Sequence, residues 1–398
     1  MKHRHCIATV VSFVLLLCVT AILFWLIPDK NFSARENRSL QTLPRFDAQK
    51  LFTGELSSAY NDYFADQFVA RDVLVTIKGT LELLAGKGEN NGILIGQGGQ
   101  LAKRLFETAR ADRNATTDSD VIDAAHLQKA AMGINRAAGN AEVPLVVFLT
   151  GRTADVATSA FLYPTEVSDA MLATLRENID QSVNYLDLVP SYRNRYADGE
   201  YVYYRTDHHW TTLGAYYAYV EIMKSFGMDY YELSDFDIET ASDSFFGTTW
   251  SRSGFKFVGC DTIEYFHLKG ADESKYTSTI HDTTYTKGEM KGFYDRDYLK
   301  MKDKYSSFLS GSNKYTSIIK EGEERETLLL IKDSFGHSIA PFLALHFNVE
   351  MIDLNYNNNI ASYFKTLDVD KVVLVYNMEN VISTDNIGKL RFKITTEQ

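Results

Sequence analysis

The sequence predicts an α/β fold in which helices cover both faces of a parallel, doubly wound sheet. Short continuous apolar runs, typical of strands buried on both faces, alternate with segments of helical periodicity. This strand–helix–strand order places the strands side by side in one parallel sheet. The predicted strands are residues 144–150, 183–189, 327–333, 349–354 and 368–377, and the predicted helices are residues 118–139, 167–179, 211–226 and 338–347.

A long segment of different composition interrupts this alternation. Residues 228–322 are rich in Tyr, Ser, Thr, Asp and Lys and lack strong periodicity, so we expect an insertion of short strands and loops. The insertion belongs to an extracytoplasmic domain predicted over residues 51–398. At its start, residues 51–86 have helical patterning, and residues 90–101 predict a β-hairpin with a glycine-rich turn. Residues 28–50 are polar and predict a juxtamembrane stalk.

The N-terminal segment predicts a membrane anchor. Residues 7–27 form an apolar run of about 21 residues without a charge, long enough to cross roughly 30 Å of hydrocarbon as a helix. Lys2 and Arg4 precede the run, so residues 1–6 should form a cytoplasmic tail. No A-x-A-like cleavage site follows, which favours an uncleaved anchor over the alternative of a cleaved signal peptide. On either interpretation residues 30–398 lie outside the cytoplasm.

Composition narrows the class of protein further. The formal net charge is −11 and the sequence pI is about 5.4. Because nucleic-acid binders are usually basic, we expect no nucleic-acid partner. Cys6 and Cys18 lie in or beside the apolar run, and Cys260 is alone in the remainder. The globular part therefore has neither an internal disulfide nor a cysteine zinc site. The 24 tyrosines suit either a surface that binds sugars or an ordinary amphipathic core.

Two polar motifs fall where open α/β sheets bind ligands. Asp207 and His209 precede a predicted helix, and side chains two apart on an extended segment can point the same way. A carboxylate so placed can hold an imidazole in the tautomer of a catalytic base. Ser334 follows a predicted central strand and precedes a helix, whose N-terminal N–H groups could stabilise an oxyanion. The three residues together predict a nucleophilic Ser-His-Asp site.

Each motif also has an alternative interpretation. A strand–Asp–Ser–helix junction is often only a helix N-cap, and adjacent histidines beside an aspartate are often structural. A metal site is the competing chemistry, since Asp207, His208, His209, His337 and His346 are suitable ligand types. Adjacent His208 and His209 do not easily converge on one ion, however, and the sequence has no H-x₃-H or HExxH motif. We therefore expect neither a metal nor a cofactor.

Several segments together resemble the DHHW family of bacterial envelope proteins. The signature lies in YYRTDHHWTTLGAYYAY (203–219). Further matching segments stand in the expected order: FSARENRSLQTLP (32–44), DQFVARD (66–72), NGILIGQGGQL (91–101), SFFGTTWS (244–251) and LLLIKDSFGHSIAPFL (328–343). That family is similar to the alginate O-acetylation proteins, which have SGNH-hydrolase-like domains. The resemblance implies a three-layer α/β/α domain of the SGNH type.

The resemblance also implies roles for individual residues. The T-D-x-H-W motif of the alginate O-acetylation proteins corresponds here to Thr206, Asp207, His208, His209 and Trp210. His209 would be the base, Asp207 its orienting partner and Ser334 the nucleophile, in an order that is permuted relative to the usual SGNH order. Three further residues are expected to support the site: Tyr204, Gly336 as a turn residue, and Asn377 as the counterpart of the oxyanion asparagine.

Three functions follow as hypotheses. By the resemblance, Ser334 would accept an acyl group, usually acetyl, and pass it to a hydroxyl of a cell-envelope polysaccharide or to water. An O-acyltransferase or esterase of this kind would need a multi-pass membrane partner to deliver acetyl groups from the cytoplasm. The alternative is a catalytically inactive protein that binds glycan or assists assembly through its tyrosine-rich insertion. A metal-dependent hydrolase is the third hypothesis.

Overall fold

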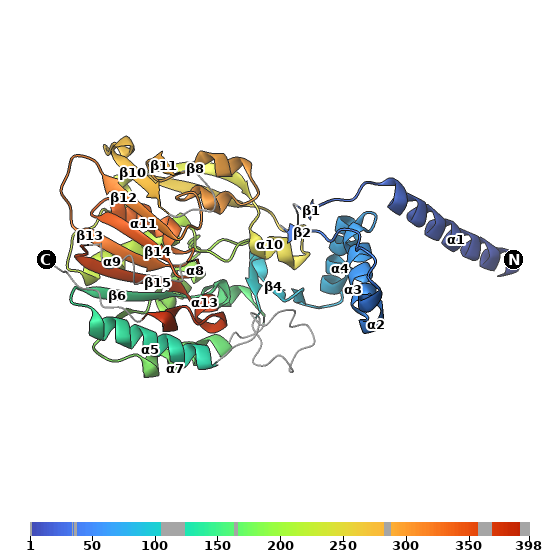
Figure 1. Ribbon diagram of the computed structural model, residues 1–398, viewed down its shortest axis with the longest axis horizontal. Helices are drawn as coiled ribbons and strands as arrows, with labels where there is room; N and C mark the ends of the chain where they lie inside the picture. The colour runs from blue at the N-terminus through green and yellow to red at the C-terminus, as the bar shows by residue number, and fades with distance from the viewer. Residues whose placement is uncertain are drawn as a thin grey trace. The chain divides into compact units, whose positions relative to one another are not determined.

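The computed structural model describes residues 2–33, 35, 38–104, 124–162, 166–281, 288–356 and 368–390 (Figure 1). The chain divides into two compact units. The first comprises Met1–Lys87 with Gly254–Phe257, and the second comprises Gly88–Ser253 with Val258–Gln398. Residues 51–86, which the sequence assigns to the extracytoplasmic domain, thus fold within the first unit.

The second unit is built around an eight-stranded sheet with the strand order β11-β10-β12-β14-β13-β15-β6-β7. Its five parallel strands all correspond to predicted ones: β14 (Asn348–Asp353), β13 (Thr327–Lys332), β15 (Lys371–Asn377), β6 (Leu145–Thr150) and β7 (Asn184–Leu186). The predicted helices are present as α5 (Ala124–Asn140), α7 (Glu166–Asn178), α9 (Thr212–Ser225) and α11 (Gly336–Ala344). Residues 118–123 of the first predicted helix lie outside the described residues. The predicted α/β fold is confirmed.

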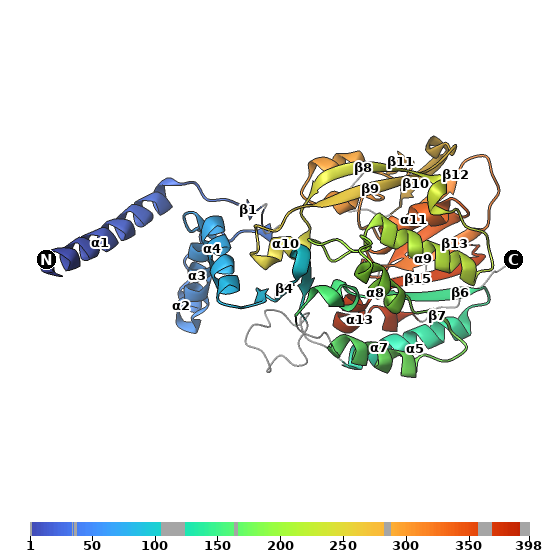
Figure 2. The ribbon, with the colours of Figure 1, turned by 180° about the vertical axis from the view of Figure 1, so that it is seen from behind.

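Helices cover both faces of this sheet and give it three layers (Figures 1 and 2). Along β13, Leu328 and Leu330 belong to the apolar core shared with α9 and α11. Leu329 and Ile331, which point the other way, belong to the core shared with α5, α7 and α13 (Met378–Ser383). Full burial stabilises each such side chain by about 1.5–3 kcal/mol relative to exposure, which explains why the strands are continuous apolar runs.

The predicted insertion adds an antiparallel edge to the sheet. Strand β12 (Tyr315–Lys320) pairs antiparallel with β14, followed by β10 (Tyr276–Ile280) and β11 (Glu289–Lys291). The sheet is therefore mostly, not wholly, parallel. A separate antiparallel pair is formed by β8 (Phe236–Phe245) and β9 (Asp261–Leu268). The short helices of the insertion are η4 (Leu233–Asp235), α10 (Thr248–Ser253), η5 (Glu273–Lys275), η6 (Arg296–Lys300) and η7 (Lys304–Ser307).

A small antiparallel sheet begins the second unit and confirms the predicted hairpin. It contains β3 (Glu89–Asn90), β4 (Ile93–Ile95) and β5 (Leu101–Lys103), with η1 (Gln97–Gly99) between the last two. The turn from β3 to β4 consists of Asn91 and Gly92, both with positive φ (51° and 72°), as tight hairpin turns require. The remaining helices of the unit are α6 (Thr153–Val156), η3 (Thr158–Ala160), α8 (Val189–Ala197) and η8 (Ile387–Lys389).

Among the described residues, the first unit contains one helix that is long and apolar enough to cross a membrane. This is α1 (Lys2–Leu26), whose apolar part spans Ile7–Leu26, and it fits either an anchor or a signal sequence. The short strands β1 (Phe32–Ser33) and β2 (Arg38–Ser39) follow, and then the helices α2 (Ala48–Thr53), α3 (Glu55–Gln67) and α4 (Arg71–Leu84). Buried Asp66 of α3 accepts hydrogen bonds from Arg38 (2.9 Å) and from the Gln41 backbone (2.9 Å), so the segment between α1 and α2 contacts α3.

Candidate active site

The loop that carries the DHHW sequence is held at two places. One is its base, and the other is Thr206, which bonds to a residue of the insertion. Tyr203 and Trp210 form an isolated antiparallel bridge on either side of the loop. Asp261, at the start of β9 and fully buried, accepts a hydrogen bond from the Thr206 backbone N–H (2.7 Å) and another from the Thr206 hydroxyl. Because both ends of the loop are held, the side chains between them have little freedom to reorient.

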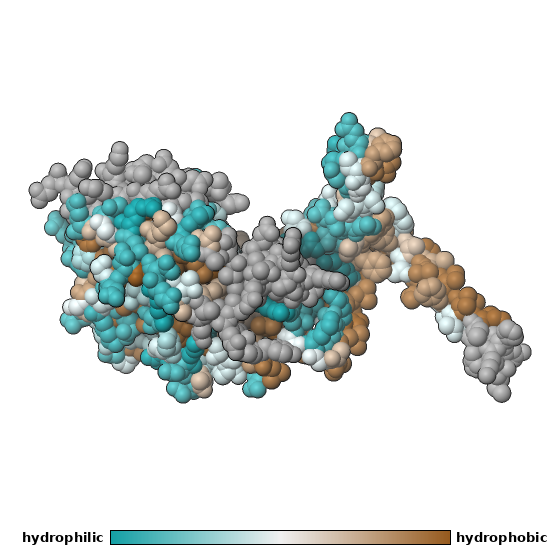
Figure 3. Space-filling view, turned by 90° about the horizontal axis from the view of Figure 1, so that it is seen from below, coloured by the Kyte–Doolittle hydropathy of each residue, from teal (hydrophilic) through white to brown (hydrophobic). Residues whose placement is uncertain are grey.

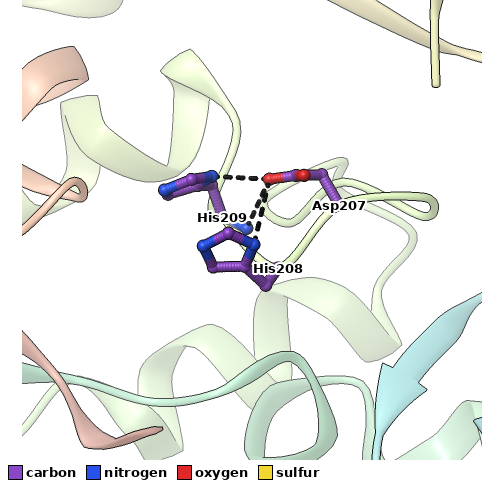
Figure 4. Close-up of side chains that lie close together, drawn as sticks. All are labelled: Asp207, His208 and His209. Carbon is purple, nitrogen blue, oxygen red and sulfur yellow. Dashed lines mark hydrogen bonds and ion pairs between the residues drawn. The ribbon is translucent and has the colours of Figure 1, made fainter. Parts of the chain in front are cut away.

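Asp207, His209 and Ser334 form a continuous hydrogen-bonded row. His209 Nδ1 lies 2.5 Å from Asp207 Oδ1, and His209 Nε2 lies 2.7 Å from Ser334 Oγ. Figure 4 shows the two histidines converging on the aspartate from one loop. Ser334 comes from the turn after β13, 125 residues further along the chain. Asp207 and His209 are buried and Ser334 is partly exposed, so the serine end of the row faces solvent.

The charge of Asp207 determines where the protons of this row lie. Burial alone would raise the pKa of Asp207, but nearby His208 and His209 and the hydrogen bonds it accepts outweigh burial and hold the pKa below its ordinary value. An ionised carboxylate can only accept hydrogen bonds, so His209 Nδ1 must carry a proton. Nε2 of the neutral ring is then an acceptor, and the Ser334 hydroxyl donates to it.

The second carboxylate oxygen of Asp207 is held by the start of α10. Asp207 Oδ2 accepts hydrogen bonds from the backbone N–H of Thr248 (2.8 Å) and from its hydroxyl (3.0 Å). Gly247 lies so close that a Cβ at this position would come within 2.3 Å of the Asp207 Cβ. The segment around Gly247 therefore fits against Asp207 only because it lacks a side chain there.

The turn that presents Ser334 is held by the neighbouring Asp333. This fully buried carboxylate accepts hydrogen bonds from the backbone N–H groups of Phe335 (3.0 Å) and Asn377 (2.7 Å) and from the Asn380 side-chain amide (2.8 Å). Burial, the largest cause, raises the pKa of Asp333 to about 6. Asp333 thus supports the turn structurally and is not part of the row formed by Asp207, His209 and Ser334.

Groups that were expected to stabilise an oxyanion make other hydrogen bonds. The side-chain amide of Asn377 donates to Thr150 Oγ1 (2.9 Å), and its carbonyl oxygen caps α13. At the start of α11, the backbone N–H of Gly336 donates to the carbonyl of Asp333 (3.0 Å). Asn377 therefore ties β15 to β6, and its amide is engaged away from Ser334.

A buried ion pair lies behind the turn that presents Ser334. Lys332 Nζ donates to Asp353 Oδ2 (2.7 Å) and to His337 Nε2 (2.7 Å). Burial and the Lys332 charge lower the pKa of His337 well below its ordinary value, so this histidine is neutral. A Cβ at Gly336 would come within 2.5 Å of the Lys332 Cβ. Gly336 is thus required for close packing, not for a turn with positive φ.

An aromatic side chain from the insertion covers the imidazole of His209. The Tyr305 ring of η7 stacks on it with centroids 3.8 Å apart and planes within 10°. The Tyr305 hydroxyl hydrogen-bonds to Ser338 Oγ (3.0 Å), which also accepts from Trp210 Nε1 (2.7 Å). Trp210 is fully buried and anchors its end of the loop to α11. Stacking therefore limits tilting of the His209 ring out of line with Asp207 and Ser334.

His208 and Tyr204, two further predicted site residues, lie outside the row of Asp207, His209 and Ser334. His208 is partly exposed, lies beside His209 with ring centroids 3.9 Å apart and planes tilted by 38°, and hydrogen-bonds through Nδ1 to Thr248 Oγ1 (2.8 Å). Tyr204 is fully buried and packs edge-on against Phe245 and Tyr305. Among the described residues its hydroxyl has no hydrogen-bond partner. Tyr204 therefore supports the loop through packing.

The three residues of the DHH sequence also qualify as a candidate metal site. One ligand atom from each of Asp207, His208 and His209 lies within 4.8 Å of the others. The adjacent histidines therefore lie closer together than expected, and the absence of a metal stays a prediction. A metal there would have to replace hydrogen bonds that His209 makes through both ring nitrogens. His337 and His346 bond elsewhere, His346 to the Tyr219 hydroxyl (2.7 Å).

Sequence reasoning missed the residues that hold the row in place. Thr248 lies within the SFFGTTWS segment that carries part of the family resemblance, so that segment was a usable signal. Asp261 and Tyr305 stand in the aperiodic insertion, where no local pattern marks them. Their roles emerge only from contacts made over long stretches of chain, such as the 55 residues between Thr206 and Asp261.

Fold and geometry together define an α/β domain with a Ser-His-Asp arrangement at the carboxyl edge of a mostly parallel sheet. The family model for DHHW protein matches residues 152–353, and the chain belongs to this family. The matched region includes Asp207, His209 and Ser334.

Two solved structures share this fold, and a third is more distantly similar. A DHHW family protein from Eubacterium siraeum is 20% identical, with a TM-score of 0.54 over 75% of this chain and 95% of its own. Bacillus cereus PatB1, solved with a sulfonyl adduct, is 17% identical, with a TM-score of 0.58 over 75% of this chain and 100% of its own. The O-acetyltransferase domain of Pseudomonas putida AlgJ is 15% identical, with a TM-score of 0.44 over 74% and 93%. A comparison with curated proteins finds no match.

Proposed function

We propose that this protein is an extracytoplasmic O-acyltransferase or esterase that acts on cell-envelope polysaccharide through an acyl-serine intermediate. The observation that carries the proposal is the row of two hydrogen bonds, 2.5 and 2.7 Å long, from Asp207 through His209 to the partly exposed Ser334. The similarity of its T-D-x-H-W sequence to that of the alginate O-acetylation proteins supports acetyl as the acyl group. The polysaccharide acceptor follows from the same similarity.

The first half-reaction transfers the acyl group to the protein. His209 Nε2 takes the proton of the Ser334 hydroxyl as the oxygen attacks the carbonyl carbon of the donor ester. The tetrahedral intermediate carries a negative oxygen, for which we assign the Ser334 backbone N–H, near the start of α11, as a donor. Its collapse breaks the ester bond, and His209 returns the proton to the departing alcohol.

The second half-reaction releases the acyl group. A sugar hydroxyl, or water, gives its proton to His209 and attacks the acyl-serine carbonyl. Collapse restores the Ser334 hydroxyl with the proton held by His209. In both halves the imidazole becomes positively charged for a moment, and ionised Asp207 stabilises that charge. The face of the stacked Tyr305 ring is also electron-rich and favours a cation on the imidazole.

The proposal also includes the side of the membrane on which the domain lies. We infer that α1 is retained as a single anchor with a cytoplasmic N-terminus, which holds the site on the outer side of the membrane. A donor of cytoplasmic origin then requires a multi-pass membrane partner, because this chain contributes one span among its described residues.

Trapping the intermediate tests the proposal directly. Purified protein is mixed with 4-nitrophenyl acetate, quenched in acid and digested, and the peptides are analysed by mass spectrometry. We expect acetyl on Ser334 and none on Ser234, an exposed serine of the insertion that serves as the control. Acetyl-Ser334 that decays faster when a polysaccharide acceptor is added supports transfer. A folded protein that never acquires acetyl at Ser334 contradicts the proposal and favours a glycan-binding role.

The pH dependence of the reaction follows from the buried base. Burial, the largest cause, and the neighbouring His208 charge lower the pKa of His209 to about 4, although Asp207 acts in the opposite direction. Protonated His209 cannot accept the serine proton, so kcat/KM should be constant near neutral pH and fall only as pH approaches 4. His208→Gln removes the neighbouring charge and should move this fall to higher pH. A fall centred at or above 6.5, the ordinary histidine value, would show that the burial argument is wrong.

A further inference from the structure

Helix α4 of the first unit presents apolar side chains to the outside. Its exposed residues include one charged side chain, Lys78, at the edge of the face. The others form what we term the apolar α4 face: Val73, Leu74, Ile77, Leu81 and Leu84. At 3.6 residues per turn these five lie within an arc of about 100°. The polar residues of this helix are thus turned mainly away from its exposed side.

The neighbouring helix of the same unit has the usual arrangement. Buried Leu56 and Tyr63 of α3 face inward, whereas its exposed positions are mostly polar: Glu55, Ser57, Ser58, Asn61 and Asp62, with Phe64 and Ala65. The two helices therefore differ in what surrounds them, although both lie in one compact unit. An apolar stripe with no cover inside its unit indicates that a nonpolar medium or a partner covers it.

The packing of α1 against α3 within this unit indicates which medium that is. Phe24, within the apolar part of α1, contacts the rings of Phe64 (5.2 Å) and Tyr63 (5.9 Å) of α3. The Tyr63 hydroxyl hydrogen-bonds to Asp29 (3.1 Å), three residues beyond α1. The end of the apolar helix and α3 are therefore packed together, with no free linker between them.

The start of α4 is held close to the C-terminal end of α1. Gln67, the last residue of α3, hydrogen-bonds to both backbone groups of Lys30 (3.0 and 2.9 Å). Arg71, the first residue of α4, lies 3.8 Å from the buried carboxylate of Asp66. The apolar α4 face thus begins within a few residues of the point where α1 would leave the membrane. Figure 3 shows hydrophobic side chains, in brown, along α1 and on the helices of the same unit.

We propose that the apolar α4 face lies in the lipid at the extracytoplasmic surface of the membrane that α1 spans, so that α4 is a second, monotopic membrane contact beside the anchor. Amphipathic helices bury such a stripe about 5–10 Å into the boundary of headgroups and acyl chains. Lys78 at the edge of the face can extend its ammonium group back to the headgroups. Trp25, which is 71% exposed near the end of α1, is an aromatic residue of the kind enriched at this boundary. The proposal rests on the retention of α1 proposed above.

Depth-dependent fluorescence quenching tests this contact in the full chain. The protein, with Cys6, Cys18 and Cys260 replaced by serine, is reconstituted in phosphatidylcholine–phosphatidylglycerol vesicles. One variant carries the environment-sensitive dye NBD at Leu81→Cys on α4, and its matched control carries NBD at Asn61→Cys on the polar side of α3. Doxyl-labelled lipid should quench the dye at 81 at least about two-fold more than the dye at 61, because only the former reaches the acyl chains.

Other outcomes would overturn the proposal in distinguishable ways. Equal quenching at 81 and 61, with the protein floating with the vesicles, means that α4 is not in lipid and needs a protein partner. Protein that does not float with the vesicles contradicts the retention of α1 and with it this contact. Acetylation of Ser334 is measured separately on the same samples, so a failed membrane contact and a failed enzymatic function cannot be confused.

Discussion

Replacing Ser334 with alanine should reduce the kcat of acetyl-ester turnover by about 10⁴-fold or more, because the variant has no oxygen to form the acyl intermediate. The structure makes this the most severe single change, since Ser334 Oγ is the atom that His209 Nε2 contacts at 2.7 Å. The loss should appear in kcat more than in KM, because the hydroxyl contributes mainly after the substrate has bound. Steady-state kinetics with 4-nitrophenyl acetate measure it.

The same experiment shows whether the residues act as a unit. His209→Ala should lose activity to a similar extent, and the double variant should be no worse than either single variant. Ser234→Ala, an exposed serine of the insertion, should keep the parent rate and serves as the matched control. Independent, multiplying losses from Ser334 and His209 would contradict a mechanism in which the base acts through this serine.

Asp207→Asn is expected to have the second-largest effect, a fall in kcat of about 10⁴-fold in protein that still folds, although the His209 backbone N–H loses its acceptor at Oδ1. The new side chain can keep its carbonyl oxygen toward the Thr248 N–H, which now lies 2.8 Å from Oδ2. Its amide group then faces His209 Nδ1 and donates to it, so the proton of the ring moves to Nε2. A protonated Nε2 cannot accept from Ser334, and the row is reversed. Kinetics and a thermal unfolding curve of the same sample measure both effects.

Asp333→Asn provides the contrasting control beside Ser334. Both oxygens of Asp333 accept hydrogen bonds from N–H groups, so no orientation of an asparagine amide satisfies every donor. We expect a loss of about 1–3 kcal/mol in the free energy of unfolding from the unmatched polar groups. If Asp207→Asn unfolds as readily as Asp333→Asn while its remaining folded fraction turns over normally, Asp207 is a structural residue and the proposed role is wrong.

The parallel part of the fold could be predicted because its physics is local. Residues 327–333 and 349–354 are buried on both faces, so each is a continuous apolar run visible without any partner. The antiparallel edge was not predicted, because β10 and β12 contain many hydroxyl residues and only partly alternate between buried and exposed positions. Their place in the sheet is decided by pairing with strands elsewhere in the chain: β12 pairs with β14, and β10 pairs with β12.

The central residues of the site were also predictable, whereas their supports were not. Asp207, His209 and Ser334 stand next to regular elements, where a sequence pattern predicts both the element and its carboxyl edge. Tyr305 is one of 24 tyrosines, and nothing in its neighbours indicates that its ring stacks on an imidazole. Contacts of this kind arise from chain closure over long distances, which periodicity does not encode.

The position of β13 between β14 and β15 has a consequence for biogenesis. Both flanking strands follow β13 in the chain, so they are the last strands of the sheet to leave the ribosome. The hydrogen-bonded row from Asp207 through His209 to Ser334 is therefore completed only when β14 and β15 have been made and have paired with β13. Under the proposed function, truncated or arrested chains would carry the aspartate and histidine without an activated serine. Acyl donors would thus be protected from hydrolysis by immature protein.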